Sequence, residues 1–279
     1  MAQPGLTTVH LPIGRAAPEP QSFSVPARHS PRLQALLERL NADEELRQLW
    51  RCANVNVVDR LGLGDSGEVH ARIVANAALK LLRLLRDAGE HPGVSEAHRL
   101  APDEAEVVVV LAAALHDLDL AIHPDLWPGG LALAALKARD LLTALYPVRE
   151  RTILLAEVLH AISALPAETR CLTLEASVLK LADALDMTKG RVRLPAELGH
   201  APDGASLAVV NEVNIQRHRT PPVRVLIHLA AVEGARQVEA LLSRKLRLTG
   251  LEGRVEVLAH SSGAGEPDLV PLRVWGGGH

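Results

Sequence analysis

The stretch from Val107 to His123 joins an apolar helix pattern to side chains that bind metals or protons. Its first nine residues, VVVVLAAAL, are all apolar, and the polar residues that follow without a turn signal are His116, Asp117, Asp119 and His123. A helix that is apolar on every side is typical of the centre of a domain. Imidazole and carboxylate groups at the end of such a helix need a cation or a dense hydrogen-bond network, because burying an unpartnered charge is costly.

Three other segments with helical periodicity also place a histidine or an aspartate among apolar residues. His70 begins the apolar face of VHARIVANAALKLL, His160 lies on the apolar stripe of ILLAEVLHAI, and Asp183 interrupts the leucines of VLKLADALD. Side chains three, four or seven positions apart share one face of a helix. The sequence therefore predicts four helices that direct these groups towards a common interior.

The order of His70, the doublet His116-Asp117 and then Asp183 on successive apolar helices resembles the HD superfamily of metal-dependent phosphohydrolases. The resemblance covers roughly residues 43–193. It implies an all-helical domain in which those four residues are the metal ligands. It also implies hydrolysis of a phosphate mono- or diester, such as a nucleotide or a related compound, with a metal-activated water as the nucleophile.

Asp119 is the candidate proton-transfer residue. It lies one predicted helical turn after His116 on the same stripe, near the expected position of the attacking water. Together with Asp117 it forms the candidate catalytic pair. The alternative interpretation of Asp119 is a solvated carboxylate beside the site.

Four further residues complete the candidate site. His160 is either a ligand of a second metal or a hydrogen-bonded core histidine. His123, Lys189 and Arg191 are candidates for binding the substrate phosphate. The alternative for these three is a structural role, because cationic side chains at helix C-termini are stabilised by the helix dipole.

Mixed imidazole and carboxylate ligands predict a divalent transition metal (Mn, Fe, Zn, Co or Ni), and Mg is also compatible with them. Two rival functions stay open beside the phosphohydrolase: a metal-dependent nuclease, and a nucleotide-binding regulatory module without turnover. An aromatic content of 2% and a net charge of −3 disfavour nucleic acid as a partner. Leu118-Asp119 follows the doublet, where the superfamily often has Ile-Gly, and this difference gives the regulatory module some weight beside the preferred phosphohydrolase.

The chain of 279 residues divides into three regions, and the predicted fold class is mainly α. Residues 1–31 contain six prolines and predict a mostly disordered arm. Residues 32–195 form the helical HD-type domain, and residues 205–275 form a small α+β domain for oligomerisation or regulation. The predicted helices are 32–41, 43–61, 68–88, 103–122, 131–145, 149–163, 173–188 and 234–248, and the predicted strands are 207–216, 223–230, 254–260 and 269–275.

The composition predicts a cytoplasmic protein without a membrane segment. The first residues lack a basic and apolar leader pattern, and the longest apolar run is half as long as a membrane-spanning helix. Two cysteines far apart in the sequence fit a reducing compartment. The strands of the C-terminal unit are too few to form a large core alone, so they should pack on the helical domain or on a second copy. We therefore expect a homodimer.

Overall fold

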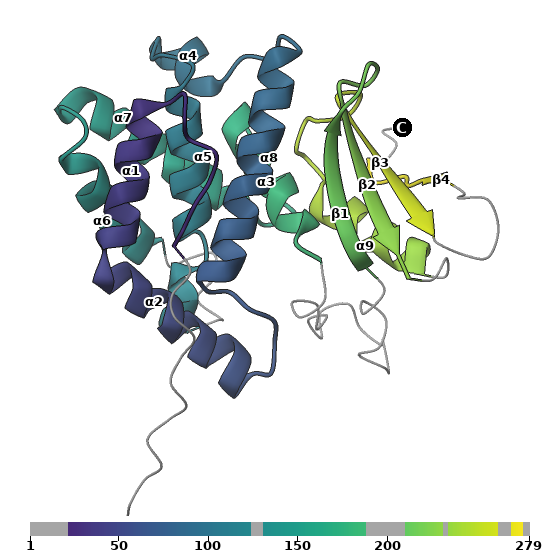
Figure 1. The fold of residues 1–279 in the computed structure, drawn as a ribbon, viewed down its shortest axis with the longest axis horizontal. Helices are drawn as coiled ribbons and strands as arrows, with labels where there is room; N and C mark the ends of the chain where they lie inside the picture. Colours follow the sequence, from purple (N-terminus) through teal and green to yellow (C-terminus); the bar gives the residue numbers. More distant parts are fainter. Residues whose placement is uncertain (1–21, 124–130, 188–209, 231–233, 262–268, 276–279) are drawn as a thin grey trace, which may run out of the picture.

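The computed structural model describes residues 22–123, 131–187, 210–230, 234–261 and 269–275. In these ranges a helical domain lies beside a four-stranded sheet (Figure 1), so the prediction of a mainly α chain with a small α+β unit is confirmed. The helices are α1 (Pro31–Ala42), α2 (Glu44–Asn54), α3 (Glu68–Asp87), α4 (Gly93–His98), α5 (Glu104–Leu115), α6 (Ala132–Thr143), α7 (Val148–Ser163), α8 (Leu174–Leu185) and α9 (Ala235–Lys245), and the strands are β1 (Val210–Arg217), β2 (Val223–Leu229), β3 (Val255–Ser261) and β4 (Leu269–Pro271).

Helix α5 lies at the centre of the helical domain. All of its residues from Ala105 to Leu115 are buried, and it contacts α1, α3, α4, α6, α7 and α8. A helix surrounded in this way has little surface in contact with water, which explains the nine apolar residues from Val107 to Leu115. The segment that follows α5 is consequently held inside the domain.

Helix α5 ends at Leu115, so the predicted continuous helix to residue 122 is wrong. His116 and Asp117 form a turn, and a short 3-10 helix, η2 (Leu118–Ala121), follows. Two carbonyls in the last turn of α5 are taken by side chains: Trp50 Nε1 donates to Ala114 O at 2.9 Å, and His116 Nδ1 donates to Ala113 O at 2.8 Å. These side chains partner carbonyls that a helix end would otherwise leave open.

Two further local elements differ from the prediction. Helix α2 ends at Asn54 and continues as a π-helix, η1 (Val55–Arg60), where the sequence predicted one α-helix to residue 61. Helix α4 was not predicted, because six residues are too few for a periodic signal. The π-helix η1 lies at the end of a longer helix, where helix boundaries are hardest to predict from local patterns.

Part of the predicted arm packs on the helical core. Phe23 is 1% exposed and stacks on Trp50 with ring centroids 5.7 Å apart. Its N–H donates to Asn41 Oδ1 at 2.8 Å, and Asn41 Nδ2 donates to the Phe23 carbonyl at 2.9 Å. The prediction of disorder is therefore wrong for residues 22–30, while residues 1–21 lie outside the described ranges.

The strands of the C-terminal unit follow the order β1-β2-β3-β4. Strands β1 and β2 pair antiparallel, β2 and β3 pair parallel, and β3 and β4 pair antiparallel. Helix α9 makes the crossover that a parallel pair requires. Alternate residues of β2 are buried, β1 and β2 contact α3, and α9 contacts α8. The unit thus packs on the helical domain, one of the two expected arrangements, and the homodimer stays a prediction.

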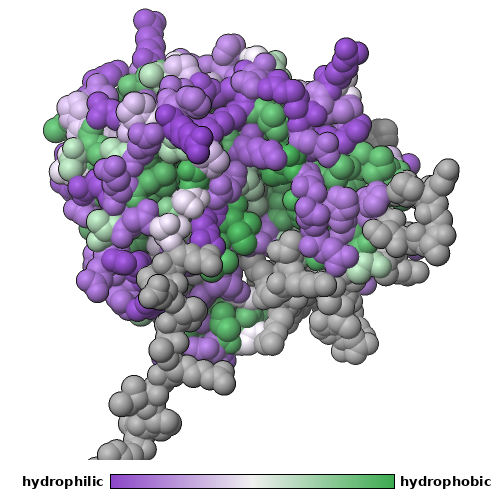
Figure 2. Space-filling view, in the orientation of Figure 1, coloured by the Kyte–Doolittle hydropathy of each residue, from purple (hydrophilic) through white to green (hydrophobic). Residues whose placement is uncertain are grey.

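Hydrophilic residues cover most of the face shown in Figure 2, and apolar residues lie between them. None of the helices in the described ranges has the length and apolarity needed to cross a membrane.

Candidate metal centre

Two buried histidines face each other where α5 ends. His70, in the first turn of α3, is 1% exposed, and His116 is 2% exposed. Their Nε2 atoms lie 2.9 Å apart. The two oxygens of Asp117 lie 3.5 Å from one Nε2 atom each, and Asp183 Oδ1 lies 3.6 Å from His70 Nε2 and 3.8 Å from His116 Nε2. The ligand atoms of His70, His116 and Asp183 fall within 4.8 Å of one another and can hold a metal ion.

The far nitrogens of both rings have hydrogen-bond acceptors. His116 Nδ1 donates to the Ala113 carbonyl at 2.8 Å, and His70 Nδ1 lies 2.7 Å from Asp186 Oδ2. A neutral imidazole that carries its hydrogen on Nδ1 has a lone pair on Nε2. Two such lone pairs repel each other at 2.9 Å, so a proton or a metal cation has to lie between them.

The pKa values at the cluster reflect an excess of negative charge. Burial alone would lower the pKa of His116, but the carboxylates of Asp117 and Asp183 outweigh burial and raise this pKa to about 9. Burial raises the pKa of Asp117. Burial would also raise the pKa of Asp183, but Lys245 and His116 hold it below its usual value. Without metal, His116 therefore retains a proton where a cation would bind.

Asp186 and Asp65 hold His70 in place, and the sequence prediction missed both. Burial, followed by the charges of Asp183 and Asp65, raises the pKa of Asp186 to about 7. Asp65 Oδ2 accepts a hydrogen bond from the backbone N–H of His70 at 2.9 Å, and Asp65 Oδ1 accepts one from Asn54 Nδ2 at 2.5 Å. The three-residue spacing from Asp183 to Asp186 was the available sequence signal, because such residues lie near each other on a helix.

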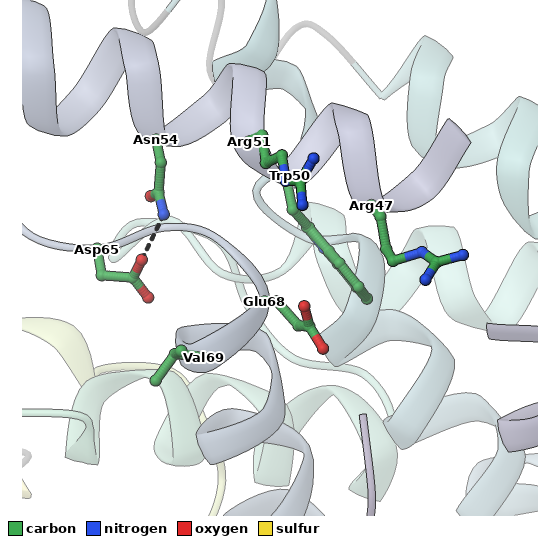
Figure 3. A pocket seen from close by; sticks show the side chains of 7 residues that line it. All are labelled: Arg47, Trp50, Arg51, Asn54, Asp65, Glu68 and Val69. Carbon is green, nitrogen blue, oxygen red and sulfur yellow. Dashed lines mark hydrogen bonds between the residues drawn. The ribbon is translucent and has the colours of Figure 1, made fainter. Parts of the chain in front are cut away.

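A small pocket of about 130 Å³ opens beside the segment that carries Asp65 and His70 (Figure 3). Its lining residues are Arg47, Trp50, Arg51, Asn54, Asp65, Glu68 and Val69. Burial raises the pKa of Glu68, against the opposing charges of Arg72, Arg47 and Arg51. Since no predicted metal ligand lines this pocket, it is separate from the metal centre.

The chain is 30% identical over 226 residues to the uncharacterized protein MJ1020 of Methanocaldococcus jannaschii. The match spans 80% of this chain and 87% of the archaeal protein. This chain belongs to the MJ1020 family. No family model and no solved structure matches the chain.

The structure brings four of the predicted site residues together: His70, His116, Asp117 and Asp183. His160, on α7, is not part of this group. Its Nε2 accepts the backbone N–H of Leu172 at 3.4 Å, and the cluster of potential ligands does not include it.

Asp119 lies on η2 rather than on an extended α5, so the predicted helical stripe of His116 and Asp119 does not form. Asp119 is 2% exposed, and its Oδ1 has no hydrogen-bond partner among the described residues. Burial and then the charge of Asp117 raise its pKa to about 6. His123 follows η2 and is exposed, while Lys189 and Arg191 lie outside the described residues.

Proposed function

We propose that this protein is a metal-dependent phosphohydrolase whose divalent cation is held by His70, His116, Asp117 and Asp183. The observation that carries the proposal is the approach of two buried Nε2 atoms to 2.9 Å while both Nδ1 atoms face acceptors. Two imidazoles and two carboxylates suit Mn, Fe, Zn, Co or Ni, and Mg is compatible with them. The resemblance to the HD superfamily supports the reaction class.

A divalent cation bound here would polarise a phosphoryl oxygen and activate water for attack on phosphorus. The substrate class that this chemistry suits is a small phosphate mono- or diester, with nucleotides as the first candidates. The Ala113 carbonyl, which can only accept, sets the N–H of His116 on Nδ1, and Asp186 orients the His70 ring. The two histidines are buried in the domain core, whereas the side chains of Asp117 and Asp183 are each 17% exposed, so a substrate could reach the carboxylate side of the centre.

Asp119 is the proposed proton-transfer residue. A carboxyl group with a pKa of about 6 can exchange protons near neutral pH, which an ordinary surface aspartate does poorly. Its buried Oδ1 has no competing hydrogen bond from the described residues. Asp119 is also separate from the proposed ligands, so its role can be tested with the cation in place.

The test uses the full chain reconstituted with each candidate metal and a panel of phosphomonoesters, cyclic nucleotides and linear diesters. Turnover by the wild type is expected on a small ester. Asp119→Asn should retain the metal and lose about 10²–10⁴-fold in kcat, the usual contribution of general acid–base catalysis. Asp59→Asn is the matched control, because Asp59 is an exposed aspartate.

The outcomes separate the rival functions. Wild-type protein that holds metal and nucleotide but turns over no substrate would be a regulatory module. Turnover confined to oligonucleotides, with salt-sensitive binding, would indicate a nuclease. Full activity in Asp119→Asn would remove that residue from the mechanism and leave the metal assignment standing.

A further inference from the structure

Helix α9 brings one cation from the C-terminal unit to the metal centre. Lys245, its last residue, places Nζ 3.5 Å from Asp183 Oδ2. The other oxygen of Asp183 faces the two histidines. The Lys245 side chain remains 44% exposed, so its ammonium is accessible to a solute that approaches the centre.

The turn after α9 fixes the position of Lys245. Cys171 N donates to the Leu248 carbonyl at 3.0 Å, and Ser177 Oγ donates to the Thr249 carbonyl at 2.7 Å. Leu246 is fully buried beside these contacts. Helix α9 thereby packs against α8, the helix that carries Asp183 (Figure 1). These contacts dock the C-terminal unit without requiring the ion pair.

The carboxylates of the metal centre favour a nearby cation such as the Lys245 ammonium. Three carboxyl groups, those of Asp117, Asp183 and Asp186, lie against the two histidines, and the Lys245 ammonium pairs with Asp183 among them. A phosphate ester adds further negative charge when it binds beside these carboxylates. An ammonium group has three donors, so contact with one carboxylate leaves donors for a phosphate oxygen.

We propose that Lys245 binds the phosphate group of the substrate beside the metal, so that the C-terminal unit completes the substrate site. This inference rests on the proposed function. The alternative is that Lys245 only docks the unit on α8. A partly exposed ion pair contributes little to docking, whereas loss of a charged hydrogen bond to an anion weakens its binding directly.

The experiment measures binding of inorganic phosphate to the metal-reconstituted full chain by calorimetry. Lys245→Gln should weaken phosphate binding roughly 10–100-fold, the usual cost of losing a hydrogen bond to a charged group, and Lys245→Arg should restore most of it. Arg244→Gln is the matched control, because it removes the same charge from an exposed neighbour on α9. Metal content and thermal unfolding are measured on every variant.

If the wild type binds metal and phosphate and Lys245→Gln binds both equally well, the Lys245 assignment is overturned. The proposed function is then unaffected. Lower thermal stability in Lys245→Gln with unchanged phosphate affinity also overturns it, in favour of docking. A wild type that binds metal but no phosphate overturns the Lys245 assignment, whereas the proposed function is decided by turnover of the ester panel. Selective loss of phosphate affinity in Lys245→Gln, with metal content preserved, supports the assignment.

Discussion

The helical domain buries carboxylates in two different ways. Beneath α4, Glu175 is fully buried, and its two oxygens accept the N–H groups of Gly93 at 2.9 Å and Val94 at 3.1 Å. At the metal centre, Asp117 and Asp183 instead approach ring nitrogens that already face each other. Backbone N–H groups partner both oxygens of Glu175, although burial still raises its pKa, whereas the facing nitrogens of the metal centre require a proton or a cation between them.

Other buried charges follow the pattern of Glu175. Lys180, 2% exposed, donates to the carbonyls of Pro166 and Thr169 at 2.8 Å each. Glu106 accepts two hydrogen bonds from Arg83, at 2.9 and 2.7 Å. Buried polar groups of native proteins generally have such hydrogen-bond partners. Buried charged groups such as these have hydrogen-bond or ion-pair partners within the chain. At the histidine pair, a bound cation would take the place of such a partner.

The largest expected effect on stability is at Glu175. Glu175→Ala should lower the free energy of unfolding by roughly 2–4 kcal/mol, because two buried N–H groups lose their acceptor. The metal content should not change. Urea denaturation checks the first expectation, with Glu96→Ala as the control at an exposed position on α4. Equal stability of the two variants would contradict a structural role for Glu175.

The affinity of the metal centre for its cation should depend on pH. The pKa of His116 is about 9, so this imidazole is protonated in the metal-free protein at neutral pH and has to lose a proton to become a ligand. Acid therefore weakens binding, and affinity should rise about 100-fold from pH 6 to pH 8. Calorimetry in buffers of different ionisation enthalpy measures the released proton. An affinity independent of pH would contradict this account.

The smallest expected effect is a gain of stability in Asp117→Asn, opposite in sign to the loss expected in Glu175→Ala. Burial raises the pKa of Asp117, so the ionised form costs free energy in the metal-free fold above the ordinary pKa of an aspartate. Asp117→Asn should stabilise the metal-free protein at pH 8, because it removes the buried negative charge. The gain should shrink as the pH falls towards the ordinary pKa of an aspartate, where the ionised carboxylate is lost. Thermal unfolding at both pH values checks it, and a loss of stability at pH 8 would contradict it.

Much of the helical domain and the set of four clustered residues could be predicted from the sequence. Polar groups such as His70 and Asp183 stand out on apolar helices, because ionisable side chains are seldom buried without a partner. The end of α5 at Leu115 could not be predicted, since Trp50, far away in sequence, takes one of its last carbonyls. Nor could Lys245, which reaches Asp183 from 62 residues away through the docking of another unit.

The packing of residues 22–30 was missed for a similar reason. One aromatic side chain, Phe23, anchors a segment whose prolines otherwise indicate disorder. For His160 the sequence left two roles open, because an inward position on a helix does not decide which cluster a side chain joins. Contacts between distant segments determine the packing of residues 22–30 and the partners of His160. Such contacts cannot be read from a local sequence pattern.

The most direct test of the central claim is the metal content of the purified full chain. The protein is stripped with a chelator, reconstituted with each of Mn, Fe, Zn, Co and Ni, desalted and measured by elemental analysis beside His116→Ala, Asp183→Ala and Glu175→Ala. We expect stoichiometric transition metal in the wild type and in Glu175→Ala, and none in the two ligand variants. A wild type that retains no metal after reconstitution, or ligand variants that retain as much as the wild type, would contradict the account.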